Sequence, residues 1–430
     1  MSTVTEKISL ASKRDDQPEN RPARCRFCSA PLSHTFVDLG MSPLCESYLS
    51  ADQLNQAEAF YPLHVYVCDQ CFLVQLEQYV GADAIFSDYA YFSSFSDTWL
   101  SHAKAYVERV SKRFSLSDTS QVIEIASNDG YLLQYFADRK IPALGIEPAA
   151  NVAEAAIGKG VPTLVTFFGT TTARQLVRDG TQADLVVANN VLAQVPDLRD
   201  FVAGFKIILK PRGVLTIEFP HLACLIEGNQ LDTIYHEHFS YFSFSTAERI
   251  LAAHGLTIFD VERLATHGGS LRLYACHDDD RTKEISQNVD ALRQEENDKG
   301  FGRIDFYSCF AERCVHTKHT LLDMLIGLKR QGHSIVGYGA PGKGNTLLNY
   351  CGIREDFLDY TVDRSPHKQG KFLPGTHIPI LHPDTITRTR PDYVLILPWN
   401  LKDEIMQHMS GIRNWNGQFI VPIPSPTIYP

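Results

Sequence analysis

Short apolar runs alternate with amphipathic segments over most of the chain, and the clearest such unit spans residues 122–147. An apolar run at 122–125 is followed by the polar turn 126–130, an amphipathic segment and a second apolar run at 143–146. This order predicts a strand, a tight loop, a helix and a second strand. Glu147 follows the second strand, where a carboxylate in a βαβ unit accepts both hydroxyls of a ribose. The unit therefore predicts a site for adenosine.

The polar turn at 126–130 indicates which adenosine cofactor fits. A dinucleotide fold uses G-x-G-x-x-G here so that amides can approach a pyrophosphate, whereas this turn has one glycine and the acidic Asp129. An acidic loop repels a pyrophosphate and suits a sulfonium and an amino group. The turn resembles the first motif of class I S-adenosylmethionine-dependent methyltransferases, the alternative being a strand-turn-helix unit without ligand. The predicted cofactor contacts are Glu124, Ala126, Asn128, Asp129, Gly130, Glu147, Asn189 and Asn190.

The same alternation continues to about residue 220 and implies a parallel sheet covered by helices. Strands are expected at 163–165, 183–190 and 213–219, with helices at 170–178 and 198–209. Asn189 and Asn190 lie at a strand tip, where cofactor and substrate usually meet. Two further strands, at 257–261 and 271–275, predict a terminal hairpin. Such a hairpin fits a methyltransferase fold better than a nicotinamide domain.

The composition narrows the class of protein. With 430 residues, of which 44% are hydrophobic, the chain can form two or three domains, each with its own hydrophobic core. The net charge of −10 argues against a nucleic-acid partner, because such proteins usually carry a basic face. No apolar run approaches the roughly 20 residues that span a bilayer, and the N-terminus lacks a signal-peptide core. We therefore expect a cytoplasmic monomer without a membrane partner, whose cysteines are thiols or metal ligands.

Two C-x-x-C pairs stand near the N-terminus, Cys25 with Cys28 and Cys68 with Cys71. Each pair can present two thiolates to one tetrahedral zinc ion, and the long interval between them must form an inserted loop or hairpin. Redox pairs are the alternative, which is disfavoured because neither pair opens a helix as a thioredoxin-like motif does. Four protein ligands leave no open position, so the zinc would be structural. Cys45 is expected to be a packed or partly exposed thiol.

A second glycine-rich loop, GYGAPGKGN, follows an expected strand near residue 334. It matches G-x-G-x-x-G, and Asp363 follows about 20 residues later, which is the spacing of an NAD site. However, Pro341 falls inside the loop, and Gly344 stands where the phosphate-binding G-K-[ST] motif needs a hydroxyl. The loop can therefore hold NAD, hold no ligand, or contact a substrate phosphate through its amides and a lysine, which we favour. The predicted substrate contacts are Lys343 and Asn345.

The expected fold class is α/β in three parts. An N-terminal zinc-binding module precedes a central class I methyltransferase domain of Rossmann-like type, and strands at 393–397 and 419–422 complete a second Rossmann-like α/β domain. The expected boundaries are a disordered tail at 1–22, the zinc-binding domain at 23–86, the S-adenosylmethionine-binding domain at 87–280, connecting helices at 281–331 and a C-terminal domain at 332–430 that closes over the substrate.

The densest group of chemically active side chains is YHEHFSYF at residues 235–242. Two histidines, a carboxylate and two tyrosines in so short a segment are costly to bury unless they are partnered or used. A metal site is one alternative, since His236 and His238 share one face of a strand, but no third ligand is evident. A hydrogen-bonded structural loop is another. We favour acid–base chemistry beside a methyl donor.

Six ordered motifs resemble those of one family. They are the paired C-x-x-C module, SDYAYFSSFS, EIASNDG, YHEHFSYF, HGGSLR and GYGAPGKGNTLLNY. Together they are similar to the bacterial sugar C-methyltransferases, which add a methyl group at C3 of nucleotide-linked 4-keto-deoxysugars. The resemblance spans about residue 25 to the C-terminus and implies a nucleotide-linked ketosugar as partner. It implies catalytic roles for Tyr235, Glu237 and His238 and a lid role for Tyr89, while Gln194 stands where relatives often carry histidine.

The implied reaction sets the chemistry of the site. A carbon beside a ketone attacks a methyl group only as an enolate, so a base must remove the α-proton while a donor stabilises the oxyanion. His238 suits the base, Glu237 can orient it or offset its charge, and Tyr235 or Tyr89 can donate to the ketone. The alternatives are an O- or N-methyltransferase on a related sugar or small molecule, an NAD-dependent oxidoreductase and a non-enzymatic zinc scaffold. The sequence leaves the nucleotide, the sugar and the choice of base among these residues open.

Overall fold

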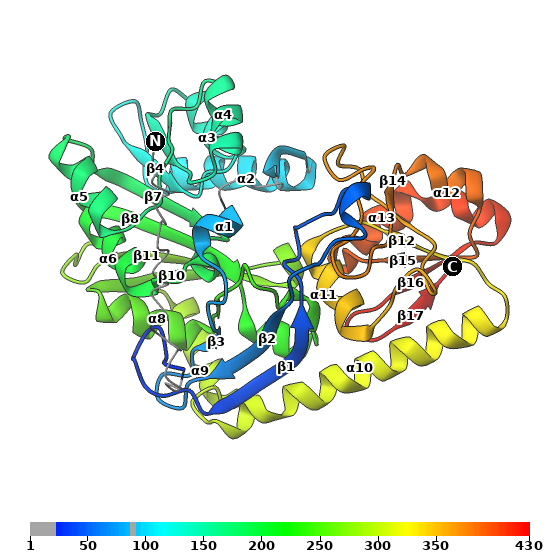
Figure 1. Ribbon diagram of the computed structural model, residues 1–430. Coiled ribbons are helices and arrows are strands. Elements are labelled where there is room, and N and C mark those ends of the chain that lie inside the picture. Colours follow the sequence, from blue (N-terminus) through cyan, green and yellow to red (C-terminus); the bar gives the residue numbers. More distant parts are fainter. Residues whose placement is uncertain (1–22, 87–91, 96) are drawn as a thin grey trace, which may run out of the picture.

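The computed structural model describes residues 23–86, 92–95 and 97–430, which form three β-sheets with flanking helices (Figure 1). The tail expected at 1–22 and the expected lid residue Tyr89 lie outside these ranges. In the described part of the chain, no helix combines the length and the apolar character that crossing a membrane requires.

The N-terminal sheet is antiparallel and includes a strand from a distant part of the chain. Its order is β1 (His34–Ser42), β2 (Tyr61–Val67), β3 (Val74–Leu76) and β9 (Ser240–Tyr241). The last strand belongs to the YHEHFSYF segment and pairs with β3 through Gln75 and Ser240. The N-terminal module therefore holds the polar segment of the expected active site directly.

The central sheet has seven strands and confirms the expected methyltransferase fold class. Its order is β10 (Leu256–Leu264), β11 (Ser270–His277), β8 (Leu209–Pro220), β7 (Ala183–Asn189), β4 (Val122–Ile125), β5 (Ala143–Ile146) and β6 (Thr163–Leu164). The strands from β8 to β6 are parallel, and β10 and β11 form the antiparallel edge hairpin that the sequence predicts. The carboxyl ends of the parallel strands are where such sheets bind ligands.

Helices cover this sheet with the apolar periodicity that the sequence shows. They are α2 (Asp97–Arg113), α3 (Leu133–Ala137), α4 (Ala150–Gly158), α5 (Thr170–Arg178), α6 (Leu198–Ile208), α7 (Leu222–Glu227) and α8 (Phe244–Ala253). In α6, Leu198, Phe201, Val202 and Phe205 recur at helical spacing and are buried, and the Asp197 side chain caps the helix by accepting from the Asp200 amide. The chain passes from α6 straight into β8 at Leu209, four residues before the expected strand start.

The C-terminal sheet has the order β14 (Ile380–Leu381), β13 (Thr361–Val362), β12 (Ile335–Tyr338), β15 (Tyr393–Ile396), β16 (Gln418–Val421) and β17 (Thr427–Tyr429). The first five strands are parallel and β17 is antiparallel. Helix α11 (Gly342–Cys351) begins in the glycine-rich loop, and α12 (Asp384–Thr389) and α13 (Lys402–His408) follow. This sheet places the loop after β12 opposite the methyltransferase sheet.

Two helices link the central and C-terminal sheets, α9 (Gln287–Lys299) and the long α10 (Asp305–Arg330), which runs beneath the N-terminal sheet in Figure 1. One hydrophobic core continues from the N-terminal sheet through α10 into the C-terminal sheet, with Phe36 stacked on Phe310 at 4.7 Å between ring centroids. The parts of the chain therefore share a core, and we keep the expected domain boundaries as a proposal.

Candidate active site

Four cysteine thiols meet in the N-terminal module, as the C-x-x-C pairs predict. The sulfur atoms of Cys25, Cys28, Cys68 and Cys71 all lie within 4.8 Å of one another, with Cys25 to Cys71 at 3.5 Å and Cys28 to Cys68 at 3.4 Å. Zinc–thiolate bonds of about 2.3 Å in a tetrahedron place sulfurs about 3.8 Å apart, so the cluster fits zinc closely. Gln75 donates to Cys25 Sγ at 3.2 Å. The four ligands are complete, which makes the ion structural.

The turn after β4 is shaped to present backbone groups to a ligand. Ala126, Asn128 and Gly130 have positive φ angles of 57°, 49° and 75°. A Cβ on Gly130 would lie only 3.1 Å from a Val161 methyl group, so glycine is required there. The Asn128 and Ala149 amides donate to Glu147, each at 2.9 Å. This carboxylate ties the turn to the end of β5 and keeps acceptor capacity for a ligand.

Two adjoining cavities lie at the carboxyl ends of the parallel strands. One, of about 280 Å³, is mostly apolar, and the other, of about 310 Å³, is more polar; Ala126, Glu147 and Gln194 line both. Asn189 Oδ1 and the side-chain amide of Asn190 are buried without a hydrogen-bond partner among the described residues. These two cavities, with Glu147 between them, could hold an adenosine cofactor, and the predicted contacts at Glu147, Asn189 and Asn190 stay predictions. The apolar lining comes from Phe86, Ile125, Ile146, Phe167, Phe168, Val191 and Phe201.

Three predicted cofactor residues, Glu124, Asp129 and Gly130, are not part of the lining of either cavity. Asp129 pairs with Lys159 at 3.1 Å and accepts from the Ser94 amide at 3.3 Å. Glu124 is fully buried, and this burial raises its pKa well above the usual value. Gly130 shapes the turn. Their direct contact with the cofactor stays a prediction. Ser93 was not predicted, yet its amide donates to Asn128 at 2.9 Å and its side chain lines the polar cavity.

His238 lines the polar cavity as a neutral ring of fixed orientation. Its Nδ1 lies 3.0 Å from the Thr233 carbonyl oxygen, which can only accept, so Nδ1 carries the proton and Nε2 keeps a lone pair. Burial lowers the pKa of His238 to about 4. His236 is turned away, with Nε2 3.1 Å from the Pro62 carbonyl oxygen. The two histidines therefore do not form a common metal site, and in the described ranges only the four cysteines cluster as metal ligands.

Tyr235 and Glu237 line the same cavity. The Tyr235 ring packs against the His238 ring with 4.1 Å between centroids, and burial raises the pKa of Tyr235 well above the usual value. The Cys45 thiol is buried, the first of the two alternatives expected for it, and donates to Glu237 Oε1 at 3.5 Å. Sequence patterns gave no sign of this contact, because the two residues are far apart in the chain.

The C-terminal sheet supplies the opposite wall. Lys343, in the first turn of α11, lines the cavity and donates to Asn400 Oδ1 at 2.9 Å. Burial lowers the pKa of Lys343, and the negative charge of Asp232 partly opposes this shift. Asn345 lies outside the lining and donates to the Cys45 carbonyl oxygen at 2.5 Å. The same helix holds the segment before His238, because Thr346 donates to the Ile234 carbonyl oxygen at 3.0 Å.

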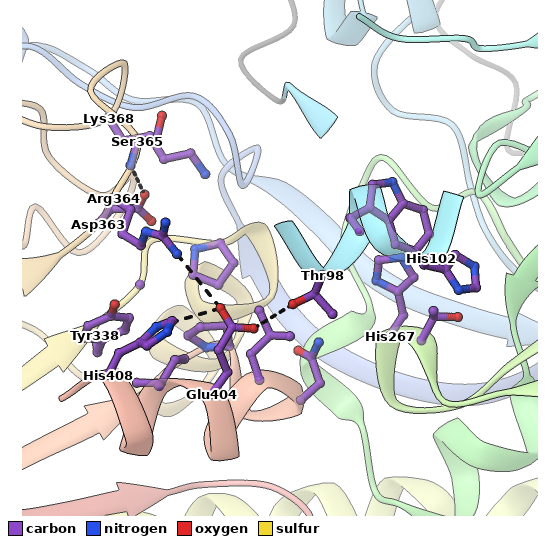
Figure 2. A pocket seen from close by; sticks show the side chains of 18 of the residues that line it. Thr98, His102, His267, Tyr338, Asp363, Arg364, Ser365, Lys368, Glu404 and His408 are labelled. Carbon is purple, nitrogen blue, oxygen red and sulfur yellow. Dashed lines mark hydrogen bonds and ion pairs between the residues drawn. The ribbon is translucent and has the colours of Figure 1, made fainter. Parts of the chain in front are cut away.

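A third cavity, of about 500 Å³, adjoins the polar one at Trp99, His267 and Pro341. Figure 2 shows His102 and His267 on its methyltransferase side and Arg364, Glu404 and His408 on its C-terminal side. Thr98 spans the gap by donating to Glu404 at 3.0 Å. The sequence singled out none of these polar side chains as a site, since they come together only through the packing of the two sheets.

Comparisons with known proteins agree with this architecture. Three family models match in order: "Putative zinc binding domain" over residues 25–86, "Methyltransferase domain" over 99–261 and "C-methyltransferase C-terminal domain" over 265–424. The chain is 33% identical over 404 residues to C-methyltransferase NovU of Streptomyces niveus, which covers 94% of this chain and 96% of that protein. The chain belongs to the C-methyltransferase family. This C-methyltransferase thus uses S-adenosylmethionine and carries a zinc-binding module.

Solved structures also resemble part of this C-methyltransferase. Magnesium protoporphyrin IX methyltransferase of Synechocystis PCC 6803 with bound SAM is 15% identical, with a TM-score of 0.32 over 42% of this chain and 82% of that one. PH0226 of Pyrococcus horikoshii OT3 is 15% identical, with a TM-score of 0.36 over 47% of this chain and 99% of that one. Likenesses at this level carry no argument about function. Membership of the family places C-methyl transfer ahead of O- or N-methyl transfer and of NAD-dependent oxidation.

Proposed function

We propose that this C-methyltransferase methylates C3 of a nucleotide-linked 4-keto-deoxysugar through an enolate, as a step of deoxysugar biosynthesis. The observation that carries the proposal is the neutral His238 ring, which lines the same cavity as Glu147 and Asn189. Removal of a carbon-bound proton needs a positioned base with a free lone pair, which the neutral ring supplies at Nε2. When bound, S-adenosylmethionine supplies the electrophilic methyl group.

His238 is the proposed base. With its pKa lowered to about 4 by burial, the ring is neutral at pH 7. Because the Thr233 carbonyl holds Nδ1, the proton from C3 goes to Nε2 and the ring becomes an imidazolium. The neighbouring Glu237 carboxylate offsets that charge. A base of such low pKa is effective only if the enolate is itself stabilised, which assigns a second task to the site.

Tyr235 is the proposed donor to the ketone oxygen. Burial raises the pKa of Tyr235 well above the usual value, so the phenol keeps its proton and can donate to the developing oxyanion. Its ring lies against the His238 ring, 4.1 Å between centroids, so donor and base can serve neighbouring atoms of one sugar. Tyr89 stays a proposed lid residue outside the described ranges.

The nucleotide is proposed to occupy the 500 Å³ cavity. Its junction with the polar cavity includes Pro341, which precedes α11. A phosphate there would meet the amides of the first helical turn and the Lys343 ammonium, the arrangement in which helix N-termini bind anions. The sugar would then extend toward His238. These contacts make nucleotide recognition a task of the C-terminal sheet.

Mass spectrometry tests the substrate class. The protein is incubated with S-adenosylmethionine and a panel of dTDP- and UDP-linked 4-keto-6-deoxyhexoses, and NMR locates any new methyl group. A 4-ketone activates two carbons, C3 and C5, and we expect methylation at C3. Methylation at C5 would overturn the position, and methylation on oxygen or nitrogen would overturn the enolate. Absence of any methylated product across the panel would overturn the substrate class.

A further inference from the structure

Residues 43–50, a loop of the N-terminal module, form a third wall of the active site. The Cys45 thiol donates to Glu237 at 3.5 Å, and Asn345 of α11 donates to the Cys45 carbonyl oxygen at 2.5 Å. Leu49 and Phe372 exchange two backbone hydrogen bonds of 3.0 and 2.8 Å. The loop is therefore fixed by the catalytic segment on one side and by the C-terminal part of the chain on the other.

Glu46 is the one residue of this loop that lines the polar cavity. The Tyr48 hydroxyl lies 2.7 Å from Glu46 Oε2 and shares its one proton between this oxygen and the Ala340 carbonyl oxygen, and the Lys368 ammonium lies 3.4 Å from Glu46 Oε2. Both partners are anchored in turn on the Ala340 carbonyl oxygen, at 2.6 and 2.9 Å. The carboxylate is thus held through one oxygen, which leaves little rotational freedom to the other.

The other oxygen, Oε1, accepts no hydrogen bond from any residue in the described ranges. It lies beside the first turn of α11, because a Cβ on Gly342 would be 3.4 Å from it. The Glu46 side chain is only 18% exposed. An oxygen placed in this way can accept a hydrogen bond from a donor group of a ligand that enters the cavity.

We propose that Glu46 binds the substrate, by accepting a hydrogen bond from a hydroxyl or protonated amine on the sugar ring. The inference rests on the proposed function and adds a specificity contact to it. The sugar is favoured over the cofactor because Glu46 shares its part of the cavity with Gly342, Lys343 and Lys368, whereas the cofactor contacts come from β4, β5 and β7. The Glu46 charge also acts on Tyr235, whose phenol is the proposed donor to the ketone.

A cycle of protein and substrate changes tests this contact. Binding of a nucleotide 4-ketosugar is measured by calorimetry in the presence of S-adenosylhomocysteine, for the wild type and Glu46→Ala. Sugars with and without the C2 hydroxyl are compared, as are sugars with a hydroxyl, an amine or hydrogen at C3. We expect Glu46→Ala to weaken binding of the parent sugar about 10- to 100-fold, which is the scale of a charged hydrogen bond. The affinity for the sugar that lacks the donor should stay within about twofold of the wild-type value.

Glu58→Gln is the matched control. Glu58 also belongs to the N-terminal module and accepts from the Gly375 amide at 2.7 Å, but it lies outside the cavity lining. The Glu58→Gln substitution should leave the affinity for the sugar unchanged. Glu46→Gln keeps an acceptor oxygen without the charge. This variant should therefore lose little sugar affinity if the donor is a hydroxyl and much sugar affinity if the donor is an ammonium. Thermal unfolding shows whether each variant folds; should Glu46→Ala not fold, Glu46→Asp, which draws the carboxylate back by one methylene, must weaken binding of the parent sugar selectively in its place.

Equal losses for all sugars, or a comparable loss in Glu58→Gln, would give Glu46 a structural role and overturn the inference alone. A weaker cofactor affinity in Glu46→Ala with sugar binding unchanged would do the same. If the wild type binds and methylates none of the ketosugars, the proposed function fails and the Glu46 inference falls with it.

Discussion

Replacement of Glu147 by alanine tests the cofactor site most simply. The Glu147 carboxylate accepts the Asn128 and Ala149 amides, both at 2.9 Å, and is placed to accept the ribose hydroxyls as well. Loss of a charged hydrogen bond to the ligand costs about 1.5–3 kcal/mol, which weakens S-adenosylmethionine binding about 10- to 160-fold. The two amides left without their acceptor should also lower the free energy of unfolding by about 1–3 kcal/mol each unless water replaces the carboxylate.

Calorimetry with S-adenosylmethionine and thermal unfolding separate the two effects. Glu154→Ala, on the exposed face of the following helix α4, serves as the control and should change neither. Burial raises the pKa of Glu147, so this carboxylate takes up a proton at a higher pH than an exposed glutamate. Affinity for the cofactor should therefore fall as pH drops through that raised pKa, and Glu147→Gln should lose this dependence. An unchanged dissociation constant in a destabilised Glu147→Ala protein would refute the ribose contact.

Two further predictions concern the zinc module and the phosphate contact. Purified protein should contain one equivalent of zinc by elemental analysis, and Cys68→Ser should lose it and also weaken S-adenosylmethionine binding. The second effect is expected because Arg26, between Cys25 and Cys28, donates to the Pro196 carbonyl oxygen at 3.1 Å, and Pro196 lines the apolar cavity. Less than about half an equivalent of zinc, unaltered by Cys68→Ser, would contradict the zinc site. Lys343→Ala should raise KM for the nucleotide sugar more than for S-adenosylmethionine, since it removes a ground-state contact. Equal effects on both would count against a phosphate role.

Local patterns in the sequence predicted the elements that depend on neighbouring residues. The strand, turn and helix around Gly130, the four zinc ligands and the β10–β11 hairpin follow from periodicity and spacing alone, and the structure has all of them. The structure also places four of the predicted site residues in the lining of one cavity, as a shared site requires: Tyr235, Glu237, His238 and Lys343.

Contacts between distant segments could not be predicted in this way. The two-residue strand β9 has no periodicity of its own and exists because β3 offers it an edge. Cys45 and Glu46 stand in a loop with no motif, and the Thr98 and Glu404 contact arises only from the packing of two sheets. Asn345 satisfied the sequence pattern of a phosphate loop, yet its side chain anchors the Cys45 backbone. In each case the partner is set by tertiary packing.

The proposed enolate is tested most directly by proton exchange at C3 without methyl transfer. A nucleotide 4-ketosugar is incubated in deuterated water with the protein and S-adenosylhomocysteine, and NMR follows the C3 proton. The wild type should exchange it, because neutral His238 can remove the proton while Tyr235 stabilises the oxyanion. His238→Asn should abolish exchange and lower kcat about 10²- to 10⁴-fold, with KM for S-adenosylmethionine little changed. Undiminished exchange and turnover in His238→Asn would contradict the assignment of the base, and normal turnover in His238→Asn, Glu237→Gln and Tyr235→Phe alike would contradict the mechanism as a whole.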